Sequence, residues 1–256
     1  MTIIRTIATV TLALLVSASA FAASPNIEEF RYSWRLRGGV RLIAGLMFPT
    51  SGVGNLKTTF GETIHSELLI TAPTGKQGGF YAYESDMNGG GAKTLMTYHG
   101  YAWGKKSRNE RTIFDHVKGL ARIRKQTPDE VENRVKKLPA TNDEVRDILT
   151  AIVYLRQNAT TLAGPLQTTI YSDGKEYPVV FKPGLSKPFT VEGKLVTARA
   201  FHIVDAPGGK KWPGGVTVWL TNDDRRVPVR IEIQQSMASL QLDLQKIESG
   251  VLLARM

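Results

Sequence analysis

Hydrophobic and polar residues alternate in short runs along most of the chain. The segment FRYSWRL, residues 30–36, places aromatic and aliphatic side chains on one face and basic or polar side chains on the other. This two-residue period is typical of a strand with one buried face. Similar runs at 64–70, 80–83 and 94–103 are separated by turns rich in glycine and proline, which favours an antiparallel, meander-like sheet. In the first strand the buried face is predicted to hold Phe30, Tyr32, Trp34 and Leu36, opposite Arg31, Ser33, Arg35 and Arg37.

Two segments have a helical pattern instead. Thr127 and Glu130 have the spacing of a capping box, and Pro128 would occupy the first helical position, so we expect a helix at 128–138 that ends at Pro139. A second helix is expected at about 142–157, because the same capping signature recurs there and apolar residues follow every three or four positions. This second helix should pack against the sheet. Its capping pair is Thr141 with Glu144, and its apolar face holds Val145, Ile148, Leu149, Ile152 and Leu155.

Two hairpins are expected in the C-terminal half. In TTIYSDGKEYPVVF, Asp173 and Gly174 supply turn residues that tolerate a positive φ. In VTVWLTNDDRRVPVRIEIQ, residues 216–234, two alternating apolar runs flank a charged segment, which places 222–225 at a solvated hairpin tip. Pro228 cannot donate a ladder hydrogen bond and so predicts an edge or a bulge. Trp219 lies on the face otherwise occupied by threonines, which suggests that both faces of this sheet meet apolar groups.

These patterns predict a mainly β protein with a few helices. The expected architecture is a single strongly curved antiparallel sheet or open barrel, with one or two helices packed against it and the helix near 142–157 in or across its mouth. We expect a signal peptide at 1–22 and a single β-rich domain at 23–256.

The first residues indicate export. Arg5 precedes an apolar stretch at 7–16, and Ala20-Phe21-Ala22 has the form that signal peptidase cleaves, so we expect cleavage after Ala22. The apolar stretch is shorter than the roughly 20 residues of a membrane span. The chain has no cysteine, so the expected mature protein is periplasmic, without a lipid-modified N-terminal cysteine or a disulfide framework.

The chain is basic, with a formal net charge of +10. Residues 100–140 include eleven basic and five acidic residues, which gives this segment a local net charge of +6. Such a balance favours anionic partners: lipids, glycans, acidic proteins or nucleic acid. Because the protein is expected to be exported, nucleic acid is the least expected of these partners. Peripheral membrane contact is compatible with this charge.

The most concentrated basic segment is KKSRNER, residues 105–111. It follows Tyr98, Tyr101 and Trp103, and a basic loop with flanking aromatic side chains could hold an anionic lipid or a sugar phosphate. A solvated loop is the simpler interpretation. The candidate ligand-binding residues are Trp103, Lys105, Lys106, Arg108, Arg111 and Trp219.

Catalytic and metal-binding signals are weak. Ser172 and Lys175 have an S-x-x-K spacing, but they lie in a predicted turn rather than at a helix start. The four histidines are not spaced as metal ligands, and Asp223-Asp224 is more simply a surface turn than a cation site. We therefore predict no catalytic residues, no metal and no cofactor.

Two segments carry a family resemblance. DILTAIVYLR, residues 147–156, and VWLTNDDRRVPVRIEI, residues 218–233, resemble the two hallmark motifs of the domain-of-unknown-function family 3108, exported proteins of the Gram-negative envelope. Thr150 stands where that family often has serine. The resemblance implies a β-rich exported protein with no assigned reaction. The matching residues are Asp147, Ala151, Tyr154 and Arg156 in the first motif and Trp219, Asp224, Arg226, Pro228 and Arg230 in the second.

The polar motif residues are interpreted as structural. Asp147 with Arg156, and Asp224 with Arg226, are expected as charge pairs that fix the helix and the hairpin. Three functions follow in order of preference. The first is a non-enzymatic envelope protein that binds an apolar or amphiphilic anionic ligand such as a lipid. The second is an assembly or scaffold factor that docks on polysaccharide or an acidic protein partner, and the third is a hydrolase using Asp224 or a histidine.

Overall fold

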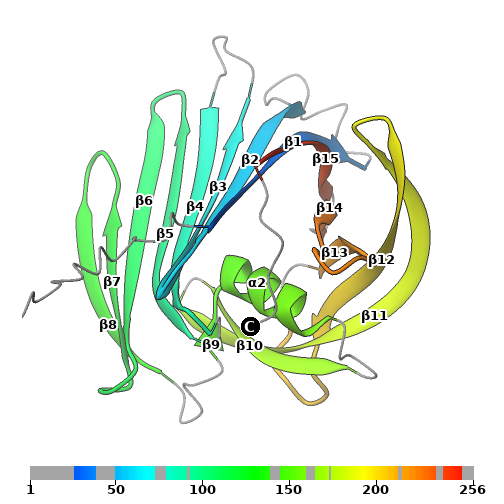
Figure 1. Ribbon diagram of the computed structural model, residues 1–256. Coiled ribbons are helices and arrows are strands. Elements are labelled where there is room, and N and C mark those ends of the chain that lie inside the picture. Colours follow the sequence, from blue (N-terminus) through cyan, green and yellow to red (C-terminus); the bar gives the residue numbers. More distant parts are fainter. Residues whose placement is uncertain are drawn as a thin grey trace, which may run out of the picture.

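The computed structural model describes residues 26–38, 50–72, 79–90, 93–138, 145–159, 165–172, 174–212, 215–234 and 239–249. Most of these residues form strands of one large sheet that curls around a helix (Figure 1). The predicted signal peptide at 1–22 lies outside the described residues. The strands are β1 (Asn26–Arg37), β2 (Ser51–Phe60), β3 (Thr63–Thr71), β4 (Gly79–Asn88), β5 (Thr94–Trp103), β6 (Lys106–Asp115), β7 (Leu120–Gln126), β8 (Val131–Lys137), β9 (Val145–Arg146), β10 (Leu166–Ser172), β11 (Lys175–Val191), β12 (Lys194–Asp205), β13 (Gly215–Thr221), β14 (Pro228–Gln234) and β15 (Ser239–Ser249).

The strand order is a meander with one long-range pairing. From β1 the chain runs outward strand by strand to β8, and from β10 it returns strand by strand to β15, which pairs with β1. All these pairings are antiparallel, and the short strand β9 adds parallel to β10. Among the described residues β8 and β9 are the two ends of the order. The mainly β, curved and open sheet that the sequence predicts is thus confirmed.

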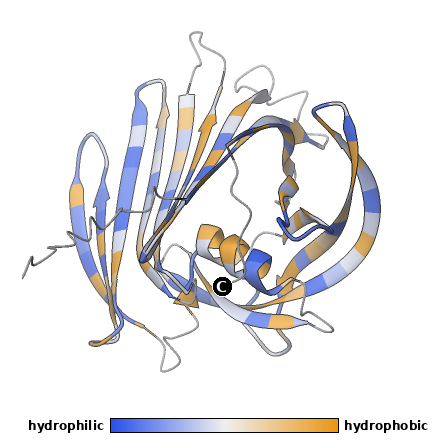
Figure 2. Cartoon of the chain, in the orientation of Figure 1, coloured by the Kyte–Doolittle hydropathy of each residue, from blue (hydrophilic) through white to orange (hydrophobic). Residues whose placement is uncertain are grey.

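The helix α2 (Ile148–Asn158) lies inside the curl, beside β4, β9 and β10 (Figure 1). Its buried side chains join the inward faces of β1–β3 and β10–β15 in the main hydrophobic cluster. A smaller cluster packs Val153 against β2–β4. Figure 2 shows hydrophobic positions on α2 and on the strands around it, whereas β6–β8 are largely hydrophilic. Among the described residues no helix has the length and hydrophobicity of a membrane span.

Strand β1 has one buried face and one exposed face. Phe30, Tyr32 and Trp34 are buried, and Leu36 is packed against the same cluster. The intervening Arg31 and Arg35 are exposed, so the predicted two faces of this strand are confirmed. The predicted runs at 64–70, 80–83 and 94–103 are β3, β4 and β5.

The first predicted helix is wrong. Residues 131–137 form strand β8, in which Val131 and Val135 are exposed and lie on the same face. Thr127 and Glu130 form the turn before it: the N–H of Glu130 donates to the Thr127 hydroxyl at 3.2 Å, as in a helix cap. Because this local hydrogen bond suits a turn equally well, the capping signature does not fix a helix. The apolar positions are too few to bury a helical face, and β7 supplies ladder partners along the whole of β8.

The second predicted helix exists, but it begins later. Asp147 is the residue that caps α2, and Val145 belongs to β9. The predicted capping pair Thr141 and Glu144 lies outside the described residues. Leu149, Ile152 and Leu155 are buried, as the helical period predicts.

Both predicted hairpins are confirmed. Strands β10 and β11 pair through Ser172 and Lys175, with Gly174 at φ +70° between them; Asp173 lies outside the described residues. Strands β13 and β14 pair with a register shift between Trp219 and Leu220, and Leu220 is the residue that pairs with Pro228. The bulge that Pro228 predicts is therefore present.

Candidate functional site

The N-terminus of α2 is held by a buried carboxylate. Asp147 Oδ1 accepts from the backbone N–H groups of Leu149 and Thr150 at 2.8 and 3.3 Å. Its Oδ2 accepts from the hydroxyls of Thr150, Ser85 and Thr94 at 2.6, 2.5 and 3.1 Å. Five donors and the positive end of the helix dipole stabilise the negative charge. Since Ser85 and Thr94 belong to β4 and β5, Asp147 anchors α2 to that part of the sheet.

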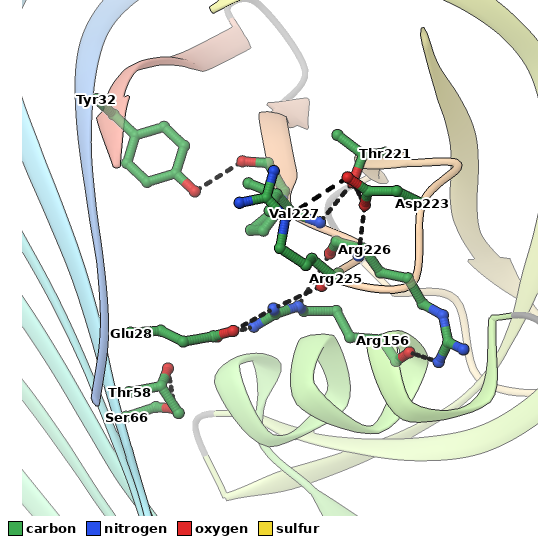
Figure 3. A network of polar contacts seen from close by, with 11 residues as sticks. Glu28, Tyr32, Thr58, Ser66, Arg156, Thr221, Asp223, Arg225, Arg226 and Val227 are labelled. Carbon is green, nitrogen blue, oxygen red and sulfur yellow. Dashed lines mark hydrogen bonds and ion pairs between the residues drawn. The ribbon is translucent and has the colours of Figure 1, made fainter. Parts of the chain in front are cut away.

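The C-terminal turn of α2 is held by a buried ion pair (Figure 3). The guanidinium of Arg156 donates to both carboxylate oxygens of Glu28, at 2.7 and 3.1 Å. The two side chains are 3% and 2% exposed. Arg156 also donates to the backbone carbonyls of Arg225 and Arg226, each at 3.0 Å. A bidentate pair supported by further hydrogen bonds to backbone carbonyls is the arrangement that makes a buried charge tolerable.

The predicted pairing of Asp147 with Arg156 is therefore wrong. These residues lie at opposite ends of α2, and each has other partners. The carboxylate that neutralises Arg156 is Glu28, which the sequence analysis did not identify. A signal for it existed, because Glu28 lies two residues before Phe30 and so continues the buried face of β1.

Arg226, in the turn between β13 and β14, also binds the end of α2. Its guanidinium donates to the backbone carbonyls of Arg156 and Gln157, the latter at 3.0 Å, so it satisfies carbonyl groups at the helix C-terminus. Its own backbone has φ +47°, a conformation that few residues other than glycine adopt. Burial lowers the pKa of Arg226, while the carboxylate of Asp224 opposes that shift and Arg156 adds to it. The charged hairpin tip is thus a turn, as predicted, and also a cap for α2.

The turn is tied internally by Asp223. Its carboxylate accepts from the hydroxyl of Thr221 at 2.6 Å and from the backbone N–H of Arg226 at 3.2 Å. On the other side, the hydroxyl of Tyr32 donates to the carbonyl of Pro228 at 2.7 Å, and burial raises the pKa of Tyr32 well above its usual range. Tyr154 carries the Arg146 guanidinium 3.7 Å above its ring. Arg156 of the helix motif and Arg226 of the hairpin motif therefore meet in one structural junction, whereas Asp147 lies at the other end of α2.

A groove of about 460 Å³ opens beside this junction. It lies between the end of α2, the hairpin tip and a bulge of β11. The bulge leaves Gly184 and Leu185 out of the ladder with β12, and Leu185 is 85% exposed. The groove is lined by Ala159, Gly184, Leu185, Ser186, Arg199, Phe201, Leu220, Thr221, Asn222, Asp223 and Arg226.

The groove combines cationic and apolar groups. Arg199 and Arg226 line it together with Leu185, Phe201 and Leu220. Phe201 and Leu220 also belong to the main hydrophobic cluster, so the groove borders the core. Among its described lining residues the one carboxylate is Asp223, which already accepts hydrogen bonds within its own turn. A cavity of this size is within the range of about 300–1,000 Å³ that holds small ligands.

The predicted basic loop is a strand. Lys105 lies in the β5–β6 turn, and Lys106, Arg108 and Arg111 belong to β6. Because side chains alternate along a strand, Arg111 points to the face opposite Lys106 and Arg108. Arg108 pairs with Glu110 at 2.6 Å. The four basic residues thus do not form one loop site; the buried Glu110, Thr112 and Phe114 show the two-residue period that marks the strand. Trp103 ends β5, and its side chain lies outside the description.

Trp219 and Arg230 lie together on the convex face of the sheet. The Lys187 ammonium lies 3.9 Å from the centre of the Trp219 ring, and Phe189 packs 5.3 Å from it. Arg230 stacks on Phe189 and donates to Asp243 at 2.5 Å. Trp219 therefore has an apolar neighbour on the outer face, as its position suggested, and it lies away from the groove. Within the described residues no group of three or more histidine, aspartate or glutamate side chains is placed to hold a metal ion.

The fold defines a barrel-like protein in which a helix lies within a curled antiparallel sheet. A solved structure of similar architecture is the crystal structure of a beta-barrel-like protein of domain of unknown function DUF1849 from Brucella abortus, with a TM-score of 0.55 and 11% sequence identity. The match covers 87% of this chain and 97% of that chain; at this identity it shows the fold alone.

The sequence profile of the family described as "Protein of unknown function (DUF3108)" matches residues 50–245. The chain therefore belongs to this family, as its two motifs predicted. A search of curated proteins gave no match.

Proposed function

We propose that this protein is an exported, non-enzymatic envelope protein that binds an amphiphilic anionic molecule, such as a lipid, in the groove at the end of α2. The observation that carries the proposal is the pairing of two guanidinium groups, Arg199 and Arg226, with the apolar side chains of Leu185, Phe201 and Leu220. A guanidinium presents a planar fork of N–H donors that matches a carboxylate or a phosphate. The apolar side chains would contact the hydrocarbon part of the same molecule.

The surroundings support a preformed site. Arg226 is positioned by the helix carbonyls to which it donates, and Arg199 Nε donates to the Gly184 carbonyl at 3.2 Å. Both cations are thereby held at the groove before any ligand arrives, which lowers the entropy cost of binding. Export is supported by the A-x-A form of residues 20–22 after an apolar stretch.

The test uses a fluorescent fatty acid as the probe. Leu185→Glu places a carboxylate in the groove at an exposed position, so the fold should tolerate it, and it should lower probe affinity by at least about tenfold through charge repulsion and lost apolar contact. Leu195→Glu is the matched control: Leu195 is also exposed, at 76%, on the neighbouring strand, and it does not line the groove. Unchanged binding in both variants, or equal loss in both, contradicts the groove as the site.

A further inference from the structure

We propose that the convex face of strands β6–β8 docks on an anionic lipid bilayer. This inference does not depend on the groove and concerns a different surface. The three strands form the end of the sheet farthest along its order from β9. The face is defined by the side chains that point away from Glu110, Thr112, Phe114 and Ile123, which are buried on the other face.

Basic side chains cluster on this face. The strand registers place Arg111 opposite Arg124, and Ile113 opposite Arg122. The next strand adds Lys137 at the same end, and all four basic residues are exposed. The one carboxylate among the described side chains of this strand face is Asp115, which pairs with Arg122 at 3.5 Å.

The opposed pair of Arg111 and Arg124 is the strongest sign of an external partner. Like charges directly opposite each other on neighbouring antiparallel strands destabilise the pairing. The protein keeps this repulsion on an exposed surface, where phosphate groups of a bilayer would relieve it. Attraction to an anionic bilayer contributes roughly 1 kcal/mol for each basic residue near the surface.

Aliphatic side chains lie among these charges and select a lipid surface over a purely polar anion. Ile113, Val131 and Val135 are 45%, 49% and 63% exposed on this face. Val117, in the turn that follows β6, is 98% exposed and lies beside Lys118. Exposed aliphatic groups beside cations suit the boundary between head groups and acyl chains, where both can be satisfied.

The surrounding charges limit the docking face and orient it. Towards β4 the same convex face becomes acidic, with Glu84 and Asp86 beside β5. At the end of strands β6–β8 away from the β6–β7 turn, the β7–β8 turn carries Asp129 and Glu130. Val131 lies beside this acidic turn. Because Ile113, Arg122, Val135 and Lys137 lie towards the β6–β7 turn, that end is expected to contact the bilayer.

The experiment is co-sedimentation of the mature protein with vesicles of phosphatidylethanolamine and phosphatidylglycerol, compared with vesicles of phosphatidylcholine alone. The wild type should bind the anionic vesicles, and binding should weaken as salt is raised. The triple variant Arg111→Gln, Arg122→Gln, Arg124→Gln should bind about 100-fold more weakly. The control triple Arg31→Gln, Lys57→Gln, Lys182→Gln removes the same charge from exposed positions elsewhere on the sheet and should bind like the wild type.

A second variant tests the aliphatic contribution without changing charge. Val117→Ser with Val135→Ser should lower binding to the anionic vesicles about tenfold. Circular dichroism of each variant checks that the fold is retained. The proposal is overturned if the wild type ignores anionic vesicles, binds phosphatidylcholine equally well, or loses binding equally in both triples. Loss of fatty-acid uptake in Leu185→Glu with vesicle binding intact separates this face from the groove.

Discussion

Arg156 and Arg226 exchange hydrogen bonds in both directions between helix and hairpin. The side chain of Arg156 donates to the backbone carbonyl of Arg226 at 3.0 Å, and the side chain of Arg226 donates to the backbone carbonyl of Arg156. The backbone of the hairpin turn thus binds the cation of Arg156, and the backbone of α2 binds the cation of Arg226. Because the residues are 70 positions apart, this contact fixes how α2 sits inside the curled sheet and where the groove opens.

Loss of Glu28 should destabilise the fold strongly. Glu28→Gln removes the charge that neutralises Arg156 in a buried site, and breaking such a pair costs about 3–5 kcal/mol. Denaturant unfolding measures the change in the free energy of unfolding. Glu29→Gln, on the other face of the same strand, is the matched control and should change stability by less than about 1 kcal/mol. Similar effects of the two substitutions would mean that the buried pair does not anchor the helix.

The backbone of Arg226 should store conformational strain. Arg226→Gly and Arg226→Ala both remove the hydrogen bonds to the end of α2, but glycine adopts a positive φ without cost. We therefore expect the alanine variant to be less stable than the glycine variant by about 1 kcal/mol. Thermal unfolding of the two variants gives this difference, and a glycine variant no more stable than the alanine variant would refute the strained conformation.

Gly52 should accept no side chain. A Cβ at this position would lie 2.1 Å from the Thr71 carbonyl oxygen and 2.6 Å from Trp34 Nε1. Trp34 Nε1 donates to that carbonyl oxygen at 2.8 Å, and this hydrogen bond joins β1 to β3. Gly52→Ala is expected to lower the free energy of unfolding by about 1–3 kcal/mol. At Gly90 a Cβ would meet nothing within 4 Å, so Gly90→Ala is the control, with little expected effect. Equal stability of the two variants would contradict the close approach at Gly52.

Tyr171 should make stability fall in alkaline solution. Burial raises its pKa to about 12 from the usual value of 10.0, so above pH 10 the unfolded chain loses this proton while the folded chain keeps it. The free energy of unfolding then decreases with pH between about 10 and 12. Among the described residues its hydroxyl has no hydrogen-bond partner, and its ring packs edge-on against that of Phe114. Tyr171→Phe should therefore be at least as stable at pH 7 and should show a shallower alkaline decline. An unchanged decline in that variant would assign the pH dependence to other groups, of which Tyr32 is the first to test.

Local patterns in the sequence predicted the features that depend on local interactions. The faces of β1, both hairpins and the bulge at Pro228 follow from alternation and turn chemistry within a few residues. The segment 128–138 was misjudged because a capping hydrogen bond forms equally in a turn, and the ladder with β7 decides its structure. Glu28 and Arg156 are 128 residues apart, and no spacing rule relates them. The groove likewise combines β11, β12, α2 and the hairpin tip, so it appears only once the sheet has curled.

The central claim is that the groove holds an amphiphilic anion, and native mass spectrometry of gently purified protein tests it most directly. The expected result is a stoichiometric adduct that solvent extraction identifies as an anionic lipid, with the adduct absent from Leu185→Glu and retained in Leu195→Glu. A mass equal to that of the mature chain alone, unchanged after incubation with envelope lipids, would contradict the claim and would favour an assembly factor that docks on a polysaccharide or an acidic protein.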